Sequence, residues 1–74
     1  MEPRVRPDYI HEARLAKARK LADHFISMGV DTDTISLLDD RGWRAISAIC
    51  HVKPPSFTTQ LMVVGLVGQA AVTQ

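Results

Sequence analysis

A chain of 74 residues forms one domain, and a domain this short buries only about 60% of the surface that its unfolded chain exposes. Apolar residues make up 46% of it, which excludes an intrinsically disordered protein, and the formal net charge is +1. The charge is unevenly spread, because six of the nine basic residues lie in the first 20 positions and residues 54–74 carry no ionisable side chain. We expect the first part to face water or a polyanion and the last part to need apolar contacts.

The cysteine content and the distribution of apolar residues indicate the cellular compartment of the protein. Cys50 is the only cysteine, which excludes an internal disulfide and favours a reducing compartment. The first 20 residues are charged and lack the apolar stretch of a secretory signal. The most apolar run, residues 61–72, is shorter than the roughly 20 residues that span a bilayer. We predict a cytoplasmic protein with no membrane partner.

The first predicted element is a long amphipathic helix. Residues 1–8, which include Pro3 and Pro7, are expected to form a flexible arm, and residues 9–74 a single helical domain. Asp8 is a suitable N-cap for a helix over residues 9–28, and Gly29 is a natural stop. Helical spacing gathers the apolar residues on one broad side: Ile10, Leu15, Ala18, Leu21, Ala22, Phe25, Ile26 and Met28.

Two shorter helices are predicted next, each preceded by aspartates that can act as N-caps. Asp31 or Thr32 begins the first, which runs to Leu38, and Asp39 or Asp40 begins the second, which runs to about residue 51. The inward residues are expected to be Ile35, Leu38, Trp43, Ile46, Ile49 and Cys50, and the outward ones Arg41, Arg44 and Ser47.

The last element is less clearly marked. Pro54 and Pro55 push the residues before them out of the helical region, so a turn is expected there, and Ser56 can cap a helix that begins at Phe57. Two glycines weaken that helix by roughly 1 kcal/mol each, which leaves a terminal strand or hairpin as the alternative. We favour the helix because a cap precedes it, and therefore predict an all-α bundle of four helices.

Catalytic and metal chemistry find little support in the sequence. Cys50 and His51 are neighbours, so on a helix they point about 100° apart and do not form a nucleophile–base dyad. The three histidines lack metal-ligand spacing, and the aspartates lack the order of a calcium-binding loop. We predict no enzyme, no metal and no cofactor, with Cys50 as a small core residue.

The order WRAISAICHV–KPPS–FTTQLMV resembles a helix-turn-helix unit over about residues 40–67. The tripeptide PPS followed by two threonines is also loosely similar to small regulators of actinobacteria and their phages. His51 stands where such turns usually have glycine, and the second helix has no arginine or lysine. In this resemblance the inward and seating residues are Ile46, Cys50, Val52, Phe57, Leu61 and Val64.

The resemblance implies a dimeric regulator that binds double-stranded DNA. It places Ser56, Thr58, Thr59 and Gln60 in the first turn of the second helix, near base edges or phosphates, with Arg41, Arg44 and Lys53 as flanking phosphate contacts. A strip with Lys17 and Lys20 on the first helix can add phosphate contacts, or it can be a solvated helix face.

The missing charges of the last element also support a rival interpretation. A helix here is apolar on two opposite sides, so it needs a second partner besides its own core. We predict that this partner is another subunit, in a two-fold homodimer, or a different protein that the chain binds as an adaptor or phage-type inhibitor. The residues assigned to this interface are Met62, Leu66, Val67 and Ala70. The remaining alternative is a last helix folded entirely into its own core.

Overall fold

The protein is an all-α bundle of four helices, as the sequence predicts. The computed structural model describes residues 7–72, with side chains placed from residue 11 onward. The helices in that range are α1 (Pro7–Met28), α2 (Thr32–Ser36), α3 (Asp40–Ile49) and α4 (Phe57–Val72). Most of the predicted N-terminal arm lies outside the described residues, but Pro7 and Asp8 already belong to α1. The helix therefore begins ahead of Asp8, with a proline at its first position, where the missing N–H has no cost.

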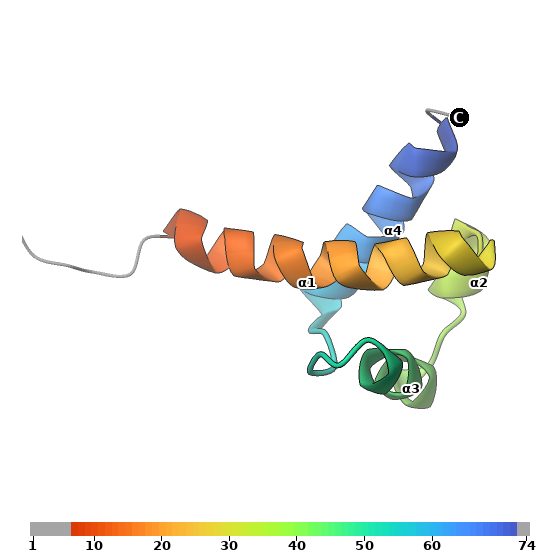
Figure 1. Cartoon of the computed structure of the whole chain (residues 1–74), viewed down its shortest axis with the longest axis horizontal. Coiled ribbons are helices and arrows are strands. Elements are labelled where there is room, and N and C mark those ends of the chain that lie inside the picture. Colours follow the sequence, from red (N-terminus) through yellow and green to blue (C-terminus); the bar gives the residue numbers. More distant parts are fainter. Residues whose placement is uncertain (1–6, 73–74) are drawn as a thin grey trace, which may run out of the picture.

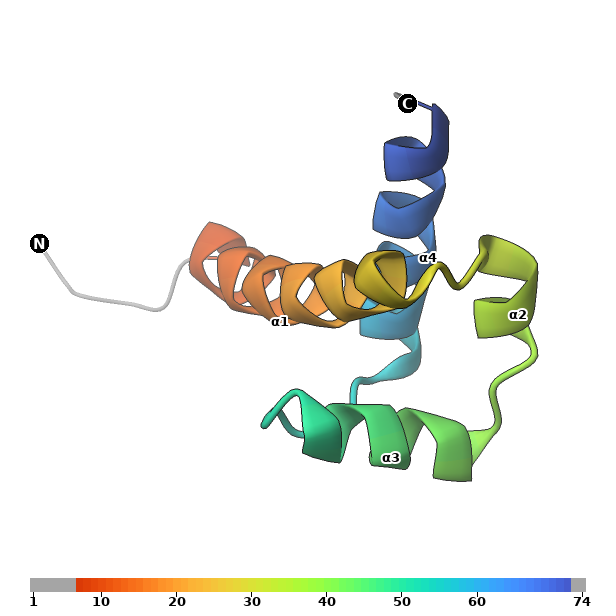
Figure 2. The ribbon, with the colours of Figure 1, turned by 45° about the vertical axis from the view of Figure 1, so that its right-hand side comes forward.

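The helices cross rather than lie parallel (Figures 1 and 2). The closest backbone contacts join α1 to α4 and α2 to α4. In both views the start of α1 extends beyond the other helices, and the end of α4 continues past α1. The start of α1 and the end of α4 are therefore covered only in part by the other helices.

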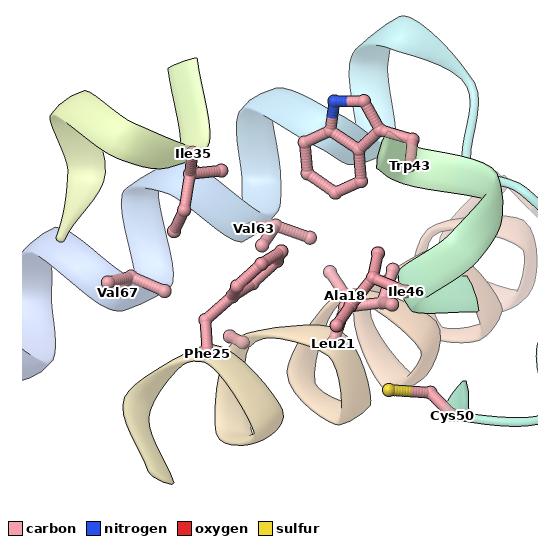
Figure 3. Packing of buried hydrophobic residues seen from close by; sticks show 10 residues of the cluster. Ala18, Leu21, Phe25, Ile35, Trp43, Ile46, Cys50, Val63 and Val67 are labelled. Carbon is pink, nitrogen blue, oxygen red and sulfur yellow. The ribbon is translucent and has the colours of Figure 1, made fainter. Parts of the chain in front are cut away.

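Side chains from all four helices meet in one core (Figure 3). Phe25 lies at its centre, between residues of α3 and α4. The ring of Phe25 and that of Trp43 meet edge to face, and this contact helps to attach α3 to α1. The buried apolar residues are Ala18, Leu21, Ala22, Phe25, Ile35, Trp43, Ile46, Cys50, Val63 and Val67.

The predicted caps are confirmed for the two short helices. The backbone N–H of Thr34 donates to Asp31 Oδ1, and that of Gly42 donates to Asp39 Oδ1, each at 2.9 Å. These bonds satisfy amide groups that have no partner within the first turn of a helix. Aspartate at these two positions therefore explains why α2 and α3 begin where they do.

The ends of α1 and α3 are built in the same way. Gly29 has φ 73° after α1, and His51 has φ 59° after α3. At each end the next amide donates to the carbonyl five residues earlier, Val30 to Phe25 O and Val52 to Ser47 O, both at 3.0 Å. This pattern is a Schellman motif, in which the left-handed position favours glycine. His51 thus occupies, with a side chain, a conformation that glycine adopts more readily.

Two residues of α3 depart from the predicted sides. Ile49 was expected inside but is largely exposed, because α3 lies at the margin of the bundle and covers only a narrow strip. Ser47 was expected outside but is buried, with its Oγ donating to Trp43 O at 2.6 Å. That bond satisfies the hydroxyl within the helix, so the side chain does not need water.

Candidate interaction surface

Helix α4 turns one side to the core and leaves the opposite side in solvent. Thr59, Val63 and Val67 are buried. On the opposite side the apolar residues Phe57, Leu61 and Val72 are 72%, 56% and 85% exposed. At 100° per residue these three share one sector of the helix with Gly65. We call the set Phe57, Leu61, Gly65 and Val72 the outer face of α4.

The outer face has no charged residue to keep it in water. None of the 16 residues of α4 is ionisable. Surface helices normally carry charged and polar residues on the side away from the core. A small domain that instead exposes three large apolar side chains on one helix has the composition of an interaction site.

Gly65 lies in the middle of this face without an internal reason to be glycine. A Cβ atom built on it meets no heavy atom within 4 Å. Glycine in a helix interior costs about 1 kcal/mol relative to alanine. Packing inside this chain therefore does not explain the residue, whereas a close approach from outside would.

Hollows lie beside both ends of the outer face. Near its start, Phe57 and Leu61 border a hollow of about 240 Å³, lined also by Ile35 and Trp43. Near its end, Val72 borders a second hollow of about 530 Å³, between α4 and the α1–α2 connection. Both hollows are partly open to solvent.

The interface residues predicted from the sequence lie on the side of α4 that faces α1 and the core. Val67 is 4% exposed and belongs to the core. Met62 and Leu66 are half-buried and pack against the same core. Leu66 and Ala70 also face α1 across a shallow hollow. This side of α4 is therefore partly covered by the chain's own α1.

Some of the residues predicted to contact DNA at the start of α4 are buried or already hydrogen-bonded within the chain. Thr59 is 2% exposed and its Oγ1 lies 3.2 Å from Ser56 Oγ, so its assignment as a base contact is wrong. Gln60 is half-buried, and its Nε2 donates to Pro55 O at 3.3 Å. Ser56 accepts from the Thr59 amide at 3.4 Å, in the predicted capping position. Of the four residues, Thr58 alone is exposed and forms no side-chain hydrogen bond within the described part of the chain; Phe57 is its neighbour in sequence.

The two helices of the proposed helix-turn-helix unit are also more loosely joined than the resemblance implies. Residues 50–56 connect α3 to α4, which is longer than the three or four residues of a standard turn. Val52 is half-buried in that connection, as expected for its apolar residue. Phe57 and Leu61 were expected to seat the second helix against the core, but both are exposed.

The predicted phosphate contacts are accessible. Arg41, Lys20 and Lys53 are exposed, and Lys17 is half-buried. Arg44 is also exposed, and it forms an ion pair at 2.9 Å with Asp40, one turn earlier on α3. Such exposed pairs contribute little to stability, so Arg44 can exchange this partner for another anion.

Cys50 ends α3, and its side chain is buried in the core beside the basic part of α1. Burial raises the pKa of its thiol, and the positive charge of Lys20 opposes that shift. Cys50 lies in the core near Leu21 of α1 (Figure 3), so the part of α1 that carries Lys20 lies near the end of α3. Among the described residues, no group of three or more histidine, cysteine, aspartate or glutamate side chains could hold a metal ion.

Two of the four outer-face residues, Phe57 and Leu61, were assigned to the core from the sequence. The signal that could have identified them is the spacing of Phe57, Leu61 and Gly65, four residues apart, in a segment without charge. No described helix is long and apolar enough to cross a bilayer. Comparisons with protein-family models, with curated proteins and with solved structures each find no match to this chain.

Proposed function

We propose that this chain is a small helical protein-interaction module that binds its partner through the outer face of α4. The observation that carries the proposal is the exposure of Phe57, Leu61 and Val72 on one uncharged side of a helix whose other side is buried. A single scattered apolar side chain would need no explanation, but three on one side of a helix that has no charged residue do.

The gain on association is physically substantial. Burying one large apolar side chain completely is worth about 1.5–3 kcal/mol. Phe57 and Leu61 are spaced one helical turn apart, as anchors are when a helix docks in a partner's groove. With no charged group on α4, docking does not require removing an ion from water. A cytoplasmic setting and a role without catalysis are part of this proposal.

The module is tested by placing a photo-crosslinking amino acid at position 61 and, as the matched control, at position 45. Leu61 is on the outer face, and Ala45 is an exposed residue of α3. Irradiation in the cells that make this chain is expected to give a discrete protein adduct from position 61 and none from position 45. Equal labelling at both positions, or none at either, would contradict the proposal.

A second candidate is binding of double-stranded DNA, as a regulator, through the basic residues of α1, α3 and the turn. The observation that favours it is that Cys50 shares the core with Ala18 and Leu21, so the part of α1 that carries the basic strip lies near the same end of α3 as Lys53. This candidate depends on phosphate contacts, because α4 supplies neither charge nor an accessible Thr59.

The DNA candidate predicts a binding constant that falls steeply with salt. Lys53→Ala and Arg44→Ala should each weaken binding about equally on any duplex and reduce the salt slope by about 1. Arg14→Ala, on the projecting half of α1, is the matched control. A duplex affinity that does not depend on salt concentration would contradict this candidate. So would a loss of affinity in Arg14→Ala equal to that in the other two variants.

A further inference from the structure

The outer face of α4 is complementary in shape to a second outer face that runs in the opposite direction. The large exposed side chains of Phe57 and Leu61 lie near its start. The larger of the two neighbouring hollows lies toward its end, beside Gly68 and Val72. Gly65 lies between the two ends and presents bare backbone.

We propose that the outer face binds a second copy of this chain, with the two α4 helices antiparallel and crossing at Gly65. The inference rests on the proposed function, because it names the partner of the same surface. In this arrangement the side chains of Phe57 and Leu61 in each copy lie against the hollow beside Gly68 and Val72 in the other. The contact is made twice by the same residues, as two-fold symmetry requires.

Charge favours a second copy as the occupant. Helix α4 is neutral along its whole length, so two antiparallel copies of it bring no like charges together. The one charged residue that lines the hollow at its end, Asp31, already accepts a hydrogen bond from the Thr34 amide. A partner surface of average composition would instead carry charged residues that lose water on docking and find no counter-charge on α4. The complementary surface to an uncharged face is another uncharged face, and this chain supplies one.

Gly65 determines how closely the two helices approach. Without a side chain at the crossing point, two helix backbones can come nearer than the usual 8–10 Å between axes. Small residues at helix crossings serve this purpose where helices associate. No other part of the described chain lies within 4 Å of a Cβ built at that position, so the missing side chain can favour packing only between copies.

The size of the face sets the expected strength. A helix of 16 residues is about 24 Å long, so one helix from each copy gives an interface at or below the roughly 1,200 Å² lower limit of standard complexes. We therefore expect a dissociation constant on the order of micromolar rather than nanomolar.

Substitution of Gly65 tests the proposal because the monomer and the dimer respond in opposite directions. Alanine is the better helix former and meets no atom in the chain, so Gly65→Ala should raise the melting temperature of the monomer. The same methyl group should weaken the dimer about tenfold in sedimentation equilibrium, and Gly65→Leu should abolish the dimer while the chain stays helical. Ala45→Leu, on α3, is the control and should leave the dimer unchanged.

Two results would overturn the dimer. One is a wild type that sediments as a monomer up to millimolar concentration, and the other is a Gly65→Leu chain that dimerises as tightly as wild type. The crosslinker at position 61 separates this failure from that of the proposed function. An adduct whose mass differs from twice the chain rejects the second copy and keeps the interaction module, whereas no adduct rejects both.

Discussion

The ring of Trp43 in α3 meets the ring of Phe25 in α1 edge to face, with centroids 5.8 Å apart and planes at 84°. Both residues are buried, and α3 is not among the helices in closest backbone contact with α4. Attachment of α3 to the bundle therefore depends on side chains, and this aromatic pair is one of the contacts that provide it.

Phe25→Ala is expected to lower the free energy of unfolding by about 3–5 kcal/mol, because it removes a buried ring and leaves a cavity beside Trp43. Phe57→Ala should change it by no more than about 0.5 kcal/mol, since that ring is exposed. Urea unfolding at low protein concentration, followed by the fluorescence of the single tryptophan, measures both. Equal losses would show that Phe25 is not a core residue.

The left-handed residues after α1 and α3 predict changes of opposite sign. His51→Gly should raise the free energy of unfolding by about 1 kcal/mol, because glycine adopts φ 59° without strain. Gly29→Ala should lower it by a similar amount, since alanine at φ 73° is strained although no atom lies within 4 Å of its Cβ. Chemical unfolding of the two variants checks the pair, and a loss of stability in His51→Gly would contradict the account.

Acid should weaken the start of α2. Hydrogen bonds from Thr34, through its side chain and then its backbone, lower the pKa of Asp31 from its ordinary value of 3.8. The folded state thus binds the proton less readily, so this stabilisation is fully present well above pH 3.8 and is lost as the pH falls below it. Asp31→Asn keeps a capping oxygen without titrating, so the stability difference between wild type and variant should shrink on acidification. A difference independent of pH between 2 and 6 would refute the assignment.

The thiol of Cys50 should react slowly in the folded protein. Burial raises its pKa, so less thiolate is present at pH 8 than in an exposed cysteine. A chromogenic disulfide reagent is expected to modify it much faster in urea than in buffer. Lys20→Ala removes the positive charge that opposes the shift and should slow the native reaction further. A native rate that matches the rate in urea would contradict the burial of this residue.

The number of helices and most of their boundaries could be predicted because local chemistry sets them. Asp31 and Asp39 have short carboxylates that bond the first free amides, and Gly29 and Pro54 exclude continuation of a helix. These effects act within a few residues, so they are visible in a single sequence. The side chains of α3 were predicted less well, since Ser47 satisfies its own hydroxyl inside the helix.

The side of α4 that faces the core could not be predicted, because both of its sides are apolar. Hydrophobic periodicity identifies a buried side only when the opposite side is polar. Leu61 and Leu66 are chemically alike, and the choice between them is made by where α1 crosses α4. The same ambiguity led to Thr59 being assigned to DNA, since a threonine in a first turn is compatible with solvent and with a core that satisfies its hydroxyl.

The most direct test compares the free energies of unfolding of Leu61→Asp and Leu66→Asp at a concentration where the chain is monomeric. Leu66 packs against the core and Leu61 lies on the outer face. The account predicts that Leu66→Asp loses about 2 kcal/mol or more, whereas Leu61→Asp unfolds within about 0.5 kcal/mol of wild type. A loss in Leu61→Asp as large as that in Leu66→Asp would contradict the claim that the outer face of α4 is free to bind a partner.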